Sequence, residues 1–131
     1  MTIELKYLVF SIILGIIQLM AAAMAGTMDR GLRWNMGPRD TTRRELSPVA
    51  GRLERAFKNF LETFAFFAAA VLVAHALNVH SWMTTWGVML YFWARVAYVP
   101  IYAAGISALR TAVWGVSVVG IVLLLAALLT R

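Results

Sequence analysis

The sequence contains no cysteine, only two histidines, and few charged residues, with 12 basic and 6 acidic side chains in 131 residues. The absence of cysteine excludes disulfides, thiolate metal sites and a cysteine nucleophile. The histidines, His75 and His80, flank "ALNV" without a third ligand nearby, so no metal site is expected. Any thiol chemistry must therefore use a thiol that arrives on a substrate.

The scarcity of charge also leaves little polar material to cover a soluble core. Hydrophobic residues make up 62% of the chain, and the mean hydropathy is +0.77. A soluble domain of this size needs a polar surface around its core, which this composition cannot supply. The sequence therefore predicts an all-α integral membrane protein, with residues 1–131 forming a single domain.

Long uncharged segments predict four transmembrane helices. Residues 7–28 contain no charged side chain, and such a helix can cross a hydrocarbon core of about 30 Å. The next uncharged stretch, 63–94, is too long for one crossing, and "HALNVHS" at 75–81 supplies a polar break. A short turn, "AAGISALR" at 103–110, precedes the last segment. The predicted spans of this four-transmembrane-helix bundle are about 5–28, 57–77, 82–104 and 111–130.

Basic residues concentrate in the first loop and predict the orientation. The 75–81 connection has no Lys or Arg, whereas the 103–110 turn ends in Arg110. The positive-inside bias predicts that the first loop and this turn are cytoplasmic and that both termini are outside. We expect Trp34 to anchor the loop at the interface and its arginines to contact lipid phosphates, and we expect no nucleic-acid partner. The basic residues of the segment 29–58 are Arg30, Arg33, Arg39, Arg43, Arg44, Arg52, Arg55 and Lys58.

The second predicted helix carries a polar face and an aromatic face. Its polar side chains recur at helical spacing and share one face, which we expect to point into the protein. We expect the opposite, apolar face to point toward lipid. Lys58 follows Glu54 by four residues, which favours a surface ion pair. The polar residues are Arg52, Arg55, Asn59 and Glu62, and the apolar ones are Phe57, Phe60, Leu61, Phe64 and Phe67.

The third predicted helix has a matching stripe of Tyr91, Arg95, Tyr98 and Tyr102. Counted from the cytoplasmic side, Glu62 and Arg95 both lie about 14–15 Å deep at the usual rise per residue. Burying either charge alone costs several kcal/mol, so we predict that they pair. The pair alone could be purely structural. The accompanying donors exceed what two charges require, which indicates a polar ligand or a wet cavity. These donors are Arg55, Asn59, Tyr98, Tyr102 and Arg110.

Two sequence blocks carry a family resemblance that covers essentially the whole chain. "GRLERAFKNFLE" (51–62) resembles the helix-2 signature of the MAPEG family, the membrane-associated proteins in eicosanoid and glutathione metabolism. "ARVAYVPIYAAGISALRT" (94–111) resembles the helix-3 segment of the same family, and "GPRD" with "YAAGISALRT" is similar to its prokaryotic branch. The matching residues are Arg52, Arg55, Ala56, Asn59, Glu62, Arg95, Tyr102 and Arg110, with Gly51 in place of a leading Glu.

The resemblance implies a homotrimer that binds glutathione between subunits near the cytoplasmic face of a bacterial inner membrane. It implies a glutathione-dependent transferase or peroxidase that acts on lipophilic electrophiles or lipid hydroperoxides. By position, Arg110 would stabilise the thiolate, and Tyr102 or the Thr111 hydroxyl could add a hydrogen bond. The residues implied to hold or line the tripeptide are Arg55, Asn59, Glu62, Tyr98 and Tyr102, with Arg95 near the glutamate.

Several departures from the family pattern keep other functions open. Phe66 stands where several members have proline, Tyr98 where one member has histidine, and Thr111 where a serine occurs, while Pro100 is expected to interrupt the third helix. One alternative is a non-catalytic lipid- or glutathione-binding protein of the same fold. A small multidrug exporter ranks third, because such exporters carry an acid in the first helix and 7–28 has none. A purely structural membrane protein would leave the excess of polar groups unexplained.

Overall fold

The computed structural model describes residues 1–31, 36–38 and 47–131, and this part of the chain contains four long helices and no strand. The all-α, four-helix prediction is confirmed. The predictions for Trp34 and for Arg33, Arg39, Arg43 and Arg44 lie outside the described residues. The helices are α1 (Ile3–Arg30), α3 (Pro48–Ala76), α4 (Trp82–Ala103) and α5 (Ser107–Leu129).

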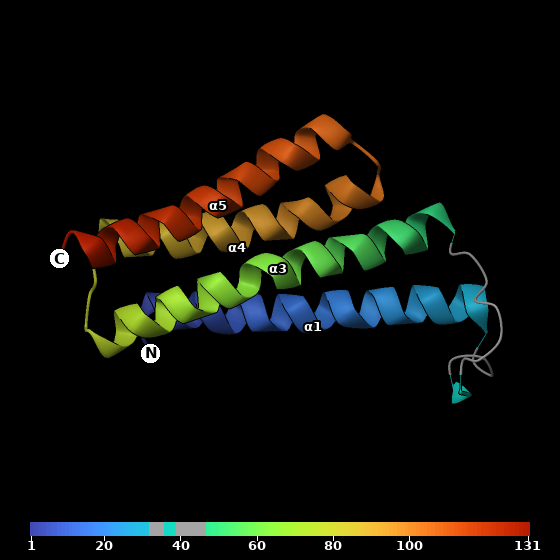
Figure 1. The fold of residues 1–131 in the computed structure, drawn as a ribbon, viewed down its shortest axis with the longest axis horizontal. Helices are drawn as coiled ribbons and strands as arrows, with labels where there is room; N and C mark the ends of the chain where they lie inside the picture. The colour runs from blue at the N-terminus through green and yellow to red at the C-terminus, as the bar shows by residue number, and fades with distance from the viewer. Residues whose placement is uncertain (32–35, 39–46) are drawn as a thin grey trace.

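The helices run antiparallel in two layers, with α1 beside α3 and α4 beside α5 (Figure 1). Both chain termini and the 77–81 connection lie at one end of the bundle, which we call the terminal end. The end of α1, the start of α3 and the 104–106 turn lie at the opposite end, which we call the loop end. The predicted order of helices therefore produces a simple up-and-down bundle.

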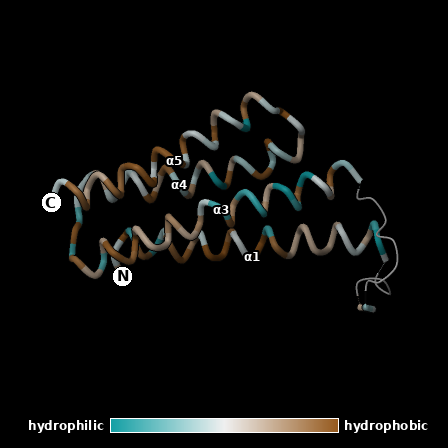
Figure 2. The backbone as a smooth tube through the Cα atoms, viewed as in Figure 1, coloured by the Kyte–Doolittle hydropathy of each residue, from teal (hydrophilic) through white to brown (hydrophobic). Residues whose placement is uncertain are grey.

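Three of the four helices, α1, α3 and α5, are long and apolar enough to cross a membrane. The 22 residues of α4 would extend about 33 Å, but this helix carries Arg95 and three tyrosines and is not in that group. Figure 2 shows hydrophobic colours along α5 and hydrophilic ones on the loop-end half of α3. The polar part of the bundle is thus concentrated toward one end.

Glycine permits a close contact between α4 and α5. A Cβ at Gly87 would lie 2.7 Å from the Gly120 carbonyl oxygen, and one at Gly120 would lie 2.6 Å from the Gly87 carbonyl oxygen. Any larger residue at either position would therefore push two backbones apart. Close packing here fixes α4 and α5 as one unit.

Phe60 and Phe67 of the apolar face of α3 are buried in the bundle, which corrects the prediction that they point toward lipid, whereas Leu61 is exposed. Phe60 and Phe67 are 1% and 0% exposed. Phe60 lies against Gly15 of α1, where a Cβ would come within 2.9 Å of its ring. Phe67 stacks on Tyr91 of α4 with ring centroids 4.0 Å apart. Because α3 packs against both α1 and α4, its apolar residues fill two interfaces.

The helix boundaries around the turn between α4 and α5 also differ from the prediction, which placed this turn at 103–110. The helix α4 continues through Pro100 to Ala103, so the proline does not interrupt it. The turn is confined to residues 104–106, where Gly105 has a φ of 78°, a region that favours glycine. Because α5 begins at Ser107, Arg110 lies in its first turn and not in a loop.

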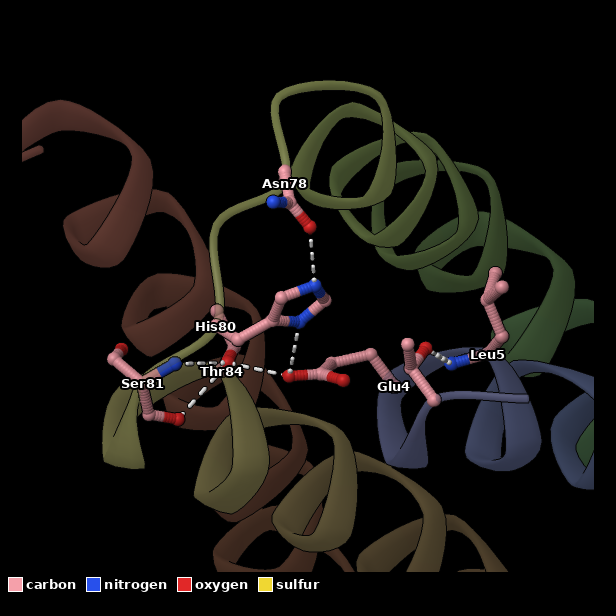
Figure 3. Close-up of polar contacts among 7 residues, drawn as sticks. Glu4, Leu5, Asn78, His80, Ser81 and Thr84 are labelled. Atoms are coloured by element: carbon pink, nitrogen blue, oxygen red, sulfur yellow. Dashed lines mark hydrogen bonds and ion pairs between the residues drawn. The ribbon is translucent and has the colours of Figure 1, made fainter.

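At the terminal end, four polar side chains form a connected group that we call the Glu4 cluster: Glu4, Asn78, His80 and Thr84 (Figure 3). Glu4 is 3% exposed. Its Oε1 accepts a hydrogen bond from Thr84 Oγ1 at 2.7 Å and lies 3.2 Å from His80 Nδ1. The other ring nitrogen of His80 lies 3.1 Å from Asn78 Oδ1. This cluster was not predicted from the sequence, and it ties the start of α1 to α4 and to the 77–81 connection.

Candidate functional site

A polar cavity of about 420 Å³ lies between α3, α4 and α5, toward the loop end. We call it the site cavity. All of the predicted site residues except Arg95 line it. Its lining consists of Arg55, Lys58, Asn59, Glu62, Tyr98, Tyr102, Arg110, Thr111 and Trp114.

The polar stripe of α3 borders this cavity because the helix runs without a break from Pro48 to Ala76. Helical spacing then places Arg55, Asn59 and Glu62 on one side. Asn59 is half-buried, whereas Arg55 and Glu62 are exposed on the single chain. The stripe therefore borders the site cavity, and on the single chain part of it is open to the surface.

Tyr102 connects the three helices around the cavity. Its hydroxyl accepts a hydrogen bond from Arg55 Nε at 3.2 Å. The Cζ atoms of Arg55 and Arg110 lie 5.9 and 5.0 Å from the centre of its ring. Because a guanidinium can only donate, the Tyr102 hydroxyl must act as the acceptor, and its own hydrogen stays available to a ligand.

The first turns of α5 supply Arg110, Thr111 and Trp114. The free N–H groups at a helix start favour negative charge, which adds to the charge of Arg110. The Thr111 hydroxyl donates to the Ser107 carbonyl at 3.2 Å. Its hydrogen is thus already used within the helix, which weakens the predicted role of Thr111 as a donor to a thiolate.

Arg95 lies behind the cavity wall and does not line the cavity. It is 1% exposed, and its Nη1 donates to Asn59 Oδ1 at 2.8 Å. The predicted pairing with Glu62 is wrong, because no ion pair joins these two described residues. Asn59, one helical turn before Glu62, accepts the hydrogen bond from the Arg95 guanidinium. Glu62 instead borders the cavity.

Lys58 lines the cavity and was not predicted from the sequence as a site residue. Its predicted ion pair with Glu54 does not form, since Glu54 Oε2 lies 3.6 Å from Arg30 Nη2. Lys58 is exposed and lines both the site cavity and a neighbouring cavity of about 540 Å³ between α1 and α3. Its position between Arg55 and Glu62 in the sequence could have indicated that Lys58 lies near the site. In the same way, Trp114 follows Arg110 by four residues, which places both on one face of a helix.

A smaller space of about 190 Å³ adjoins the site cavity and shares Arg55, Tyr102 and Arg110 with it. Arg52 lines this space, and its Nη1 donates to the Ala103 carbonyl at the end of α4 at 3.3 Å. A cation at a helix C-terminus is favourable. Arg52 therefore holds the 104–106 turn against α3 and helps to position the start of α5.

The arrangement combines three cations, one carboxylate, an amide and two phenols around one cavity. Such a lining suits a ligand with more than one anionic or carbonyl acceptor and one cationic group. The cavity volume falls in the range typical of small-molecule sites. Arg110 and the Tyr102 hydroxyl together can stabilise a developing negative charge, for example on sulfur.

Comparison with known proteins identifies the family. The model of the MAPEG family matches residues 7–130, a range that includes most of α1, the whole of the other three helices and both sequence blocks. No curated protein matches the chain. Together with three helices apolar enough to span a membrane, the family match shows an integral membrane protein. The chain belongs to the MAPEG family.

Proposed function

We propose that the protein is a membrane-bound glutathione-dependent transferase or peroxidase for lipophilic electrophiles or lipid hydroperoxides. The observation that carries this proposal is the charge pattern of the site cavity in a member of this family. Glutathione carries two carboxylates, one ammonium group and a thiol at neutral pH. Arg55, Lys58 and Arg110 can pair with its carboxylates or thiolate, and Glu62 can pair with its ammonium group.

The binding residues come from two faces of the cavity. On α3, Arg55 and Asn59 hold carboxylate or peptide oxygens, and Glu62 orients the amino group. On α4, Tyr98 and Tyr102 form the bed of the tripeptide. This division places the charged contacts on one helix and the aromatic contacts on another, which supports recognition of an extended, hydrogen-bonding ligand.

Arg110 is the residue that activates the thiol. A free thiol has a pKa near 8.5 and is only a few per cent thiolate at neutral pH. A guanidinium keeps its proton, so it acts as a fixed positive charge beside sulfur. Lowering the thiol pKa by about two units needs about 2.7 kcal/mol of preference for the thiolate. The Tyr102 hydroxyl, which accepts from Arg55, donates to the same sulfur.

We further propose a homotrimer in a bacterial inner membrane, from the prokaryotic branch of the family. Arg55, Lys58 and Glu62 are exposed on the single chain although α3 is apolar enough to span a membrane. Charges facing lipid are costly, so a neighbouring subunit covering this face explains their presence. The basic first loop and the 104–106 turn face the cytoplasm, and both termini face outside.

A non-catalytic glutathione-binding protein is the second candidate. It is favoured by the Thr111 hydroxyl, which donates to Ser107 and not toward the cavity. In that case the polar lining would bind the tripeptide without forming the thiolate.

An ultraviolet difference spectrum of the purified protein, titrated with glutathione at neutral pH, separates these functions. A saturable thiolate band that is lost in Arg110→Ala supports thiol activation. Binding without the band supports the non-catalytic protein. No binding in the wild type would contradict both functions and leave the polar residues a structural role.

A further inference from the structure

The contact between Arg95 and Asn59 determines how Asn59 can meet a ligand. Arg95 Nη1 donates to the side-chain oxygen of Asn59 at 2.8 Å. Asn59 also lines the site cavity, whereas Arg95 does not. The amide thus lies between a buried cation on one side and the cavity on the other.

The chemistry of the two groups fixes the orientation of the amide. A guanidinium has five N–H donors and no acceptor, so it can face only the oxygen of an asparagine and never its NH₂ group. An asparagine without such a neighbour could rotate and exchange the two ends. The NH₂ of Asn59 makes no hydrogen bond within the described ranges 1–31, 36–38 and 47–131. Both of its hydrogens are therefore available on the cavity side.

Packing holds the guanidinium in place. The Cζ of Arg95 lies 4.1 Å from the centre of the Tyr98 ring and 5.7 Å from that of Phe60. Phe60 in turn rests on Gly15 of α1. Three helices thus fix the position of Arg95, and through it the position of the Asn59 amide.

The remaining donors of Arg95 argue against a role in stability alone. Its Nε and Nη2 are buried and make no hydrogen bond to any residue that the structure describes. An arginine buried with unpaired donors costs stability, and an apolar residue of similar volume is often as good or better. Among the described residues the one hydrogen bond of Arg95 is to Asn59, which points to a role of Arg95 in holding this amide.

We propose that Arg95 is a positioning residue that fixes Asn59 so that the Asn59 NH₂ group donates into the site cavity, to a carboxylate or peptide carbonyl oxygen of the ligand. This inference rests on the proposed function, because it names which atoms of that site form hydrogen bonds to the tripeptide. In this inference Arg95 acts through Asn59 and does not itself contact the ligand, in contrast to the predicted binding role of Arg95.

The test measures the glutathione affinity of purified protein by equilibrium dialysis for the wild type, Arg95→Met, Arg95→Lys and Asn59→Asp. Arg95→Met removes the hydrogen bond that orients the Asn59 amide. This loss should weaken glutathione binding about five- to tenfold. Lysine also only donates, so Arg95→Lys should stay within about threefold of the wild type. Asn59→Asp keeps the contact with Arg95 but replaces the donors by an acceptor, and should weaken binding more than about tenfold.

Thermal unfolding of the same variants separates positioning from folding. Arg95→Met should unfold at the same or a higher temperature than the wild type while binding glutathione more weakly. Wild-type affinity in both Arg95→Met and Asn59→Asp would overturn the inference. Weaker binding in Arg95→Met that only follows a lower unfolding temperature would also overturn it.

A ligand-free measurement distinguishes failure of this inference from failure of the proposed function. The side-chain ¹⁵N–H₂ signals of Asn59, assigned by their loss in Asn59→Asp, should exchange with water in the wild type. They should shift in Arg95→Met and stay near the wild-type position in Arg95→Lys. If the wild type does not bind glutathione, the proposed function fails. If the ¹⁵N–H₂ signals are protected from water, the inference about Asn59 fails.

Discussion

The two ends of the bundle place polar side chains among apolar helices in opposite ways. In the Glu4 cluster at the terminal end, the carboxylate is 3% exposed and has Thr84 and His80 as partners. In the site cavity toward the loop end, Arg55, Lys58 and Glu62 are exposed, and only Arg55 bonds to another described residue. Polar groups that satisfy one another stabilise a fold, whereas groups that face open space can bind something else.

The largest effect is expected from removing the positive charge of Arg110. Arg110→Ala should lower kcat/KM for a model electrophile about 10- to 100-fold at neutral pH, because less of the bound thiol is ionised. Raising the pH above the pKa of the free thiol should restore much of the rate. Steady-state kinetics from pH 6.5 to 9 check this. Arg131→Ala, at the exposed C-terminus, is the matched control and should change nothing.

The next effect concerns the acid of the site cavity. Glu62→Gln should weaken glutathione binding about 5- to 30-fold, since the carboxylate that pairs with the ligand's ammonium group becomes neutral. Its unfolding temperature should stay close to that of the wild type, because Glu62 has no ion pair in the described part of the chain. Isothermal titration calorimetry measures the glutathione affinity, and thermal unfolding measures the stability. Wild-type affinity would remove Glu62 from the site.

The acid of the Glu4 cluster should show the reverse pattern. Glu4→Ala leaves Thr84 and His80 without their shared acceptor and should lower the free energy of unfolding by about 1–3 kcal/mol. Glutathione affinity should stay within about twofold, because the cluster lies at the opposite end of the bundle. A variant that weakened binding and kept its stability would contradict the contrast between the two ends.

The smallest effect is expected at Thr111. Its hydroxyl donates to the Ser107 carbonyl and not to the cavity, so Thr111→Val should change kcat less than about threefold. The same kinetic assay as for Arg110→Ala provides the comparison. A loss as large as that of Arg110→Ala would show that Thr111 turns toward the thiol during the reaction.

The sequence by itself determined which residues could share a face and at what depth. Helical periodicity placed Arg55, Asn59 and Glu62 together, and antiparallel order brought them to the level of Tyr98 and Tyr102. The number of helices followed from the lengths of the uncharged segments. These features depend on local geometry and composition, which can be read along the chain.

The tertiary structure alone decided which partner each side chain meets. Arg95 bonds to Asn59 and not to Glu62, Glu54 pairs with Arg30 and not with Lys58, and Phe60 is buried. Periodicity fixes the face of a helix but not its rotation against two neighbours at once. Periodicity also does not decide whether Arg95 bonds to Asn59 or to Glu62, which lie about one helical turn apart. Those choices depend on how α3 packs against α1 and α4, which involves residues far apart in the sequence.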